Sequence, residues 1–330
     1  MIIHTKAHAR AGLLGNPSDG FYGKTISFII RNFAAEVTLY ESPELEILDS
    51  DEDRSRFESL DDLVRQVNLY GYYGGVRLIR AAIKKFAEHF ANQGIRLPRR
   101  NFTIRYCSTI PRLVGMGGSS AIVTAAVRAL MRFYDIDLPK NLVPSLVLRA
   151  ETEELKIPAG LQDRVVQTYE GMVYMDFAKD LLDKQGYGYY EPLPKDLLPD
   201  CYVAYGVDFA EGTEVFHSDL RVRFGRGEPA VLDAMKRFAS FAERGKQALF
   251  ARDAKTIGKL MDANFDLRRG IMPLNPHHVQ MVEVARRFRS PCTFAGSGGT
   301  VVGLFTSHDQ LTKLRHAYHE LGCKVIRPKL

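Results

Sequence analysis

The chain has 330 residues, 45% of them hydrophobic and 25% charged, which is typical of a globular protein long enough for two domains. Its formal charge of +6 suits anionic substrates, but the basic residues are scattered, which argues against nucleic acid as a partner. The chain starts without a basic-then-apolar signal pattern, and no apolar run approaches about 18 residues. We therefore expect a cytoplasmic protein that has no membrane partner. Separately, we expect a monomer or a homodimer.

The first predicted element is a strand that ends near Leu14. The loop after it, at 15–20, contains Asn-Pro and Asp-Gly, which are both turn-forming pairs. Residues 28–40 alternate between apolar and polar side chains and predict two short strands. The acidic stretch 41–59 is then either a connection or an edge hairpin.

A helix is predicted from Gly74–Gly75 to Gly94, because its apolar residues share one face. Two tyrosines, Tyr72 and Tyr73, stand between glycines just before this helix. Tyrosine rings in such a place either stack on a sugar ring or cover the edge of the core.

The stretch 111–121 is a glycine-rich loop between a predicted strand at 102–107 and a helix whose apolar residues repeat at i, i+3 and i+4. Its glycines are Gly115, Gly117 and Gly118. Either Ser119 or Ser120 would cap the helix, and the free amides would then suit a phosphate. A spare serine hydroxyl can reach magnesium on that phosphate. The alternative is an ordinary glycine turn with a serine cap.

Further along, Pro139 begins a predicted helix that runs to Leu155 and carries acidic residues near its end. Asp163 follows Ala-Gly-Leu-Gln and precedes two valines, so we expect it in the first turn of another helix. That position favours an ionised carboxylate. A strand is predicted at 171–177.

The stretch 180–199 is rich in glycine, proline and tyrosine and resembles a domain linker. A strand is predicted after it, at 201–208. The helices predicted next lie at 230–249, 254–267 and 277–289. A strand, a helix and a strand then close the chain. The glycine-rich segment 294–300, taken alone, is a strand-to-helix turn.

Three of these segments, in this order, resemble the motifs of the GHMP small-molecule kinases. The loop 111–121 is similar to Pro-x-x-x-Gly-Leu-Gly-Ser-Ser-Ala, and 294–300 to Thr-Gly-Ala-Gly-x-Gly-Gly. Arg10, Gly15 and Asp19 match a basic residue, a glycine and a sugar-binding acid in the first motif. The resemblance implies ATP binding by residues of two loops, Gly115, Gly117, Gly118, Ser119, Ser120, Gly296, Ser297 and Gly298.

The same resemblance implies an α/β (α+β) fold of the GHMP kinase type. Its N-terminal domain, here 1–185, has a left-handed βαβ unit, and its C-terminal domain, here 200–330, is ferredoxin-like.

A segment from Ala150 to Asp163 is similar to galactokinases, in which a glutamate binds magnesium and an aspartate is catalytic. These roles fall on Glu151 and Asp163, with Glu153 or Glu154 as alternatives for the metal. Ser120 would share magnesium with Glu151. Arg10 would keep Asp163 ionised and stabilise the transferred phosphoryl group.

Segments 11–19, 71–78, 159–165 and 281–287 resemble plant-type glucuronokinases, which implies phosphorylation of the anomeric hydroxyl of D-glucuronate with ATP and Mg²⁺. Another anomeric sugar kinase, for galacturonate, galactose or a heptose, and a non-catalytic sugar sensor stay as alternatives. The residues expected at the sugar are Asn16, Ser18, Asp19, Tyr73, Arg77 and Arg164. A cation must face the substrate carboxylate, and its candidates are Arg77, Arg164 and Arg268.

Overall fold

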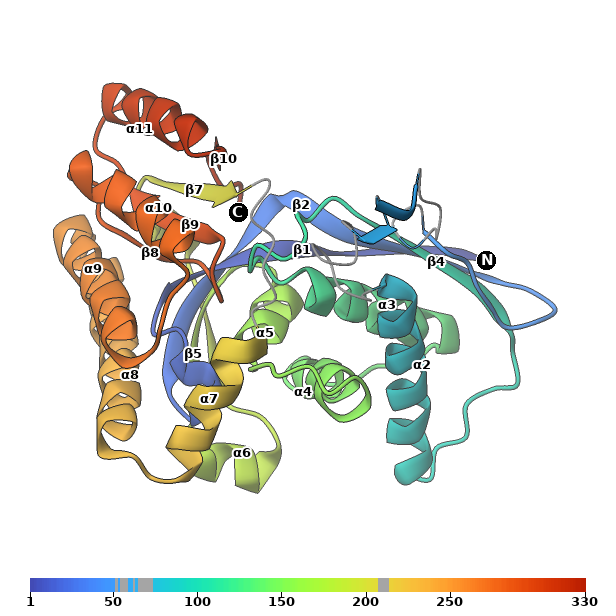
Figure 1. Cartoon of the computed structure of the whole chain (residues 1–330). Coiled ribbons are helices and arrows are strands. Elements are labelled where there is room, and N and C mark those ends of the chain that lie inside the picture. The colour runs from blue at the N-terminus through green and yellow to red at the C-terminus, as the bar shows by residue number, and fades with distance from the viewer. Residues whose placement is uncertain (51–52, 54–58, 62, 65–73, 207–213) are drawn as a thin grey trace.

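The structure is a computed structural model that describes residues 1–50, 53, 59–61, 63–64, 74–206 and 214–330. Two sheets with helices packed against them make up this part of the chain (Figure 1). No helix among the described residues is long and apolar enough to cross a bilayer.

The first sheet is organised around one long central strand. Its strands are β1 (Ile2–Leu14), β2 (Lys24–Glu41), β3 (Glu46–Ile47), β4 (Phe102–Ser108), β5 (Met172–Asp176) and β6 (Tyr189–Leu193). Their order is β3-β4-β2-β5-β6, and β1 also pairs with β2. The prediction of two short strands at 28–40 was wrong. The pairing of β1 with β2 shifts register between His8 and Ala9, so residues 31–33 of β2 have no partner on β1. Arg31 is exposed in this irregular stretch, and its sequence resembles a turn between two strands.

Four helices cover one face of this sheet (Figure 1). They are α2 (Gly75–Asn92), α3 (Gly118–Tyr134), α4 (Val143–Arg149) and α5 (Gln162–Tyr169). Strands β4 and β5 both run antiparallel to β2 and therefore parallel to each other. The helices α3 to α5 connect them, so this is the expected βαβ unit, and its left-handed sense stays a prediction. The helix predicted from Pro139 begins later, at Val143.

The stretch predicted as a linker is largely part of the first sheet. It contains the helix α6 (Lys179–Gln185) and the strand β6, which pairs with β5. The glycines and prolines of this stretch lie around and inside β6, which is an edge strand. An edge strand tolerates proline because some of its backbone N–H groups need no partner. The passage between the sheets is therefore short, from Pro194 to Asp200.

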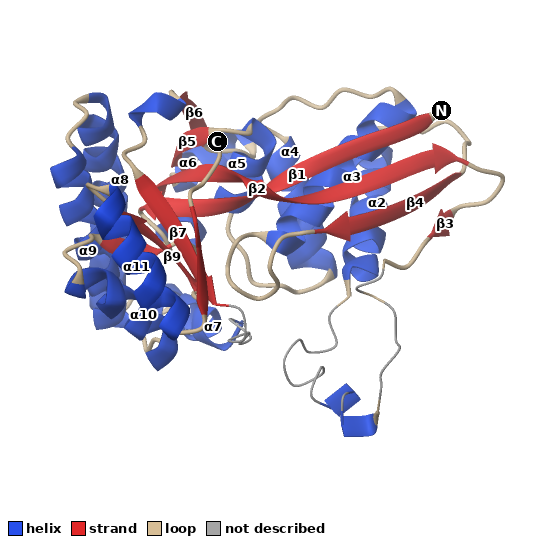
Figure 2. Ribbon diagram, turned by 90° about the horizontal axis from the view of Figure 1, so that it is seen from above, coloured by secondary structure: helices blue, strands red, loops and turns tan. Residues whose placement is uncertain are grey.

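The second sheet is ferredoxin-like, as expected. Its strands are β7 (Cys201–Gly206), β8 (Cys292–Phe294), β9 (Thr300–Leu304) and β10 (Cys323–Ile326). They are antiparallel in the order β10-β7-β9-β8, which is the 4-1-3-2 order of a βαββαβ domain. The helices that pack on this sheet are α9 (Ala254–Ile271), α10 (Pro276–Arg287) and α11 (His308–Glu320), and they lie beside it in Figures 1 and 2. The helix α8 (Pro229–Phe250) packs on α9 and on the first sheet, and α7 (Glu214–Gly225) packs on α8. The helix α7 was not predicted.

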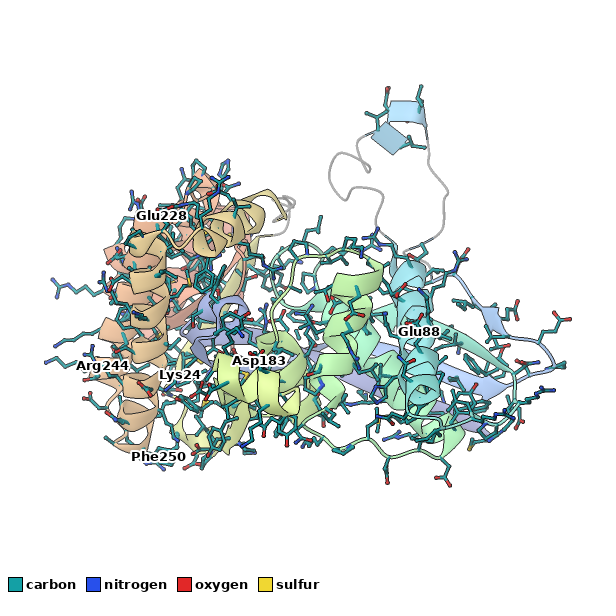
Figure 3. The ribbon with its side chains drawn as sticks, turned by 90° about the horizontal axis from the view of Figure 1, so that it is seen from below. Lys24, Glu88, Asp183, Glu228, Arg244 and Phe250 are labelled. Carbon is teal, nitrogen blue, oxygen red and sulfur yellow. The ribbon has the colours of Figure 1, made fainter. Side chains whose placement is uncertain are left out.

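The two sheets meet where β1 ends. Lys24 on β2 forms an ion pair with Glu243 of α8, and it lies beside that helix in Figure 3. Gly245 of α8 packs so closely on Leu14 that a Cβ would lie 2.2 Å from its Cδ1 atom. This contact brings the loop that follows β1 against helices of the second half, and the candidate site lies there.

Candidate active site

The glycine-rich loop between β4 and α3 leaves the amides of a helix start uncapped. Gly115 and Gly117 have φ values of 70° and 73°, which favour glycine. A Cβ on Gly115 would lie 2.7 Å from the carbonyl oxygen of Gly298, so close packing also requires glycine. Gly117 is the N-cap, and no described side chain caps α3, so the predicted serine cap was wrong. The first amides of α3 are therefore suited to an anion.

Ser119, and not Ser120, faces the expected metal ligand. The Ser119 hydroxyl donates to Glu151 Oε1 at 2.8 Å. Ser120 is buried, and its hydroxyl donates to the Gly117 carbonyl at 3.0 Å. Successive helical residues differ by about 100° in direction. The serine that contacts Glu151 is therefore Ser119, and the magnesium role of Ser120 and Glu151 stays a prediction.

Glu151 is fully buried and neutralised by an arginine. It lies in a π-helical turn after α4. Its Oε2 accepts a bond of 2.8 Å from Arg164 Nε and a second, short bond from Nη2. Arg164 Nη1 donates to the Gly160 carbonyl at 2.9 Å. Arg164 is therefore occupied, and the structure does not support its predicted contact with a substrate carboxylate.

The two alternative metal ligands lie elsewhere. Glu153 and Glu154 form ion pairs with Lys85, and Glu154 also pairs with Lys84, on the side of α2. Among the described residues, no group of three or more His, Cys, Asp or Glu is placed to hold a metal.

Arg10 joins three parts of the site that are far apart in the sequence. It is 4% exposed, and its Nε and Nη2 donate to the two carboxylate oxygens of Asp163 at 2.5 and 2.8 Å. Its Nη1 donates to the carbonyls of Gly115 at 2.6 Å and Ala295 at 3.1 Å. Asp163 lies in the first turn of α5, as predicted. A bidentate pair of this kind fixes the direction of the carboxylate and places a positive charge beside it.

The loop after β1 brings a second carboxylate beside Asp163. Asp19 Oδ2 accepts a hydrogen bond of 3.3 Å from the Gln162 amide. Burial, and secondly the charge of Asp163, raise the pKa of the Asp19 carboxyl to about 6. Ser18, expected at the sugar, is instead fully buried, and its hydroxyl donates to the Lys24 carbonyl at 3.0 Å. Its role is to hold the loop.

The third glycine-rich loop connects β8 to β9, so it is a hairpin and not a strand-to-helix turn. It packs on the glycine-rich loop between β4 and α3, which we call the phosphate-type loop. A Cβ on Gly296 would lie 2.2 Å from the Gly115 carbonyl oxygen. Thr300 donates to the Val114 carbonyl at 2.6 Å. Gly296, Ser297 and Gly298 thus lie against Gly115 of the loop that precedes α3, and their part in nucleotide binding stays a prediction.

Two of the predicted sugar residues are not placed by these contacts. Tyr73 lies outside the described residues. Arg77 is half-buried in the first turn of α2, where burial lowers its pKa.

Sequence reasoning missed two amides that hold the loops. Gln167 donates to the Gly117 carbonyl at 2.8 Å. Asn264 accepts from the Gly15 amide at 2.8 Å and donates to the Asn16 carbonyl at 3.0 Å. Their signal in the sequence is spacing: Gln167 is four residues after Asp163, and Asn264 four before Arg268, so each pair shares a helix face.

Comparison with known proteins gives the same family for both halves of the chain. The family model for the GHMP kinases N-terminal domain matches residues 77–171, and that for the GHMP kinases C-terminal domain matches 246–322. The chain is 43% identical to Glucuronokinase 1 of Arabidopsis thaliana over 306 residues, which cover 91% of this chain and 84% of that protein.

Solved structures of other small-molecule kinases have the same fold. A Lactococcus lactis galactokinase complexed with galactose superposes with a TM-score of 0.76 at 12% identity, over 100% of this chain and 93% of that one. A Methanococcus jannaschii mevalonate kinase gives 0.72 at 20% identity, over 100% and 98%.

Proposed function

The chain belongs to the GHMP kinases, and we propose that it transfers the γ-phosphoryl group of ATP to the anomeric hydroxyl of D-glucuronate. The products are ADP and D-glucuronate 1-phosphate. The observation that carries this proposal is the similarity to the Arabidopsis glucuronokinase, which extends over both domains. An arrangement of basic and acidic groups suited to phosphoryl transfer supports it.

ATP places its phosphates at the start of α3. The uncapped amides of Gly118 and Ser119 face an anion there, and the positive end of a 17-residue helix favours negative charge. Gly115 and Gly296 let the two glycine-rich loops pack against each other beside this helix start. Pre-oriented amides of this kind account for much of the catalysis of phosphoryl transfer.

Asp163 is the general base. It accepts the proton of the anomeric hydroxyl while that oxygen forms a bond to the γ-phosphorus, and the bond to the ADP oxygen breaks. An anomeric hydroxyl is more acidic than an ordinary alcohol, so a carboxylate is basic enough. Arg10 holds Asp163 by two hydrogen bonds and supplies positive charge beside the transferred group.

Magnesium fits the oxygens of Ser119 and Glu151, which lie 2.8 Å apart beside the phosphate-type loop. Magnesium in nucleotide enzymes takes one or two protein oxygens together with phosphates and water. We propose that these two residues hold it, and that when bound it neutralises charge on the phosphates. Arg164 keeps Glu151 turned toward Ser119.

The sugar lies between the loop after β1 and the start of α5. Asp19, beside Asp163, accepts hydrogen bonds from sugar hydroxyls. Asn16, on the same loop, belongs to the same wall. Because Arg164 is paired with Glu151, the carboxylate of the sugar is left to Arg77 or Arg268.

The test is ATP turnover by the purified chain against glucuronate, galacturonate, glucose and galactose, with the phosphorylated carbon identified by NMR. We expect the highest kcat/KM for glucuronate and phosphate on C1. Equal turnover of glucose or galactose would contradict the assignment of a uronic acid as the substrate. Absence of ATP turnover with every sugar would favour a sensor.

A further inference from the structure

Three buried arginines lie at the candidate site, and they differ in whether a carboxylate of the protein neutralises their charge. Arg10 is paired with Asp163, and Arg164 with Glu151. Arg268, on α9, is 1% exposed and has no carboxylate partner within the described part of the chain. Within the described residues, the site therefore holds one buried positive charge that no carboxylate pairs by a salt bridge.

The partners of Arg268 are neutral oxygens on two loops. Nη1 donates to Gly296 O at 2.7 Å and to Asn16 Oδ1 at 3.2 Å, and Nη2 donates to Ser297 O at 3.0 Å. The guanidinium carbon lies 5.3 Å from the centre of the Phe294 ring. Nε is buried without a described hydrogen-bond partner.

Arg268 stays charged at neutral pH in this setting. Burial lowers its pKa to about 10, and the charge of Asp19 opposes that shift. A buried charge without a counter-ion is costly, because the carbonyls that solvate it carry only partial charges. A bound anion on the other side of these loops would lower that cost.

The helix α9 also fixes the loop that carries the sugar-facing residues. Asn264, one turn before Arg268, holds the Gly15 amide and the Asn16 carbonyl, while Arg268 holds the Asn16 side chain. We call the loop 15–20 the wall of the proposed sugar site. Arg268 contacts this wall from the side of α9 through Asn16, and Asp19 on the same loop is near enough to interact with its charge. In the low dielectric of the interior, its charge acts across that wall.

We propose that Arg268 is the residue that determines the preference for an anionic sugar, and that it does so from behind the wall, through its charge and through the position it gives Asn16. This inference rests on the proposed function and adds the physical origin of its selectivity. Arg164 cannot supply this charge because Glu151 cancels it.

The test compares sugar binding in the wild type, Arg268→Gln, Arg268→Lys and Arg286→Gln, all as the full chain. Dissociation constants for glucuronate and glucose are measured by calorimetry, which needs no turnover of glucose, and KM for ATP is measured with glucuronate. Arg286 is the matched control, since it lies 5.2 Å from the Phe265 ring and pairs with Asp266 at 2.8 Å.

Arg268→Gln should weaken glucuronate binding about 10–100-fold, the worth of a charged interaction, and glucose binding far less. Arg268→Lys keeps the charge and should keep most of the preference. Arg286→Gln should match the wild type. A purely structural role would weaken both sugars equally, and a role toward phosphate would raise the KM for ATP; either result overturns the inference.

Asn16→Asp tests the same idea without removing the arginine. The new carboxylate keeps the acceptor for Arg268 Nη1 and neutralises its charge, so we expect a higher Tm and a loss of the preference for glucuronate. An unchanged preference overturns the inference even if Arg268→Gln fails to fold. If the wild type does not bind or phosphorylate glucuronate, the proposed function itself fails, which the wild-type arm alone reveals.

Discussion

Replacing Asp163 by asparagine should separate the chemistry of the site from its folding. An amide cannot accept the proton of the sugar hydroxyl, so we expect kcat to fall by at least ~10²-fold, the usual contribution of a general base. The same change removes one of the two hydrogen bonds that Arg10, which is 4% exposed, donates to this side chain. The new amide NH2 group of asparagine then faces an N–H group of the Arg10 guanidinium. Arg10 keeps its bonds to two carbonyls and the Asp163 side chain is 14% exposed, so the loss of stability should be about 2 kcal/mol.

The assay is ADP release with glucuronate at a temperature well below the Tm of the variant, together with thermal unfolding. Asp176→Asn is the matched control, because Asp176 pairs with Lys24 at 3.4 Å and its side chain is 19% exposed. It removes an ion pair and no base, so kcat should stay near the wild-type value. If Asp163→Asn turns over within about threefold of the wild type while folded, Asp163 is not the base.

Three further changes test other parts of the site. Ser119→Ala should raise the magnesium concentration needed for half-maximal activity, and Ser120→Ala should not; a magnesium titration with the opposite order would restore Ser120 to the metal. Gly115→Ala should raise the KM for ATP and lower the Tm, because a Cβ meets a carbonyl at 2.7 Å, whereas Gly94→Ala, at φ 73° with no atom within 4 Å, should cost only the backbone strain of about 1 kcal/mol. The raised pKa of Asp19, about 6, means that its protonated form stabilises the fold at low pH and that this contribution is lost as the pH rises through about 6. The Tm of Asp19→Asn minus the Tm of the wild type should therefore increase between pH 4 and 6. The wild-type KM for sugar should rise below pH 6, because protonated Asp19 accepts hydrogen bonds less well. Parallel Tm curves would show that the pKa of Asp19 is not raised.

The sequence by itself determined the local elements of the site. The strand at 102–107, the glycine-rich loop, the following helix and the helical start at Asp163 were predicted from the residues, whereas the ferredoxin-like second domain was implied only by the resemblance. These features depend on glycine φ values, on apolar periodicity and on short-range spacing, all of which a single sequence displays. The resemblance to GHMP kinases rests on the same local motifs.

Tertiary contacts decided which side chains face the site and which are buried. Ser119 and Ser120 are adjacent in the sequence, and only the packing of α3 turns the first toward Glu151 and the second inward. Ser18 was expected at the sugar, yet its side chain is buried and bonded to the carbonyl of the first residue of β2. The linker prediction failed because an edge strand tolerates the glycine and proline that elsewhere mark a loop.

The charges of the site were the least readable from sequence, for a physical reason. The partners of Arg10 lie 105, 153 and 285 residues away along the chain, so no local pattern pairs them. Arg164 and Arg268 are equal candidates as residue types, but folding gives the first a buried carboxylate, whereas the hydrogen-bond acceptors of the second, among the residues described, are neutral oxygens. Electrostatic energy depends on distance and burial in space, and those quantities exist only once the chain has folded.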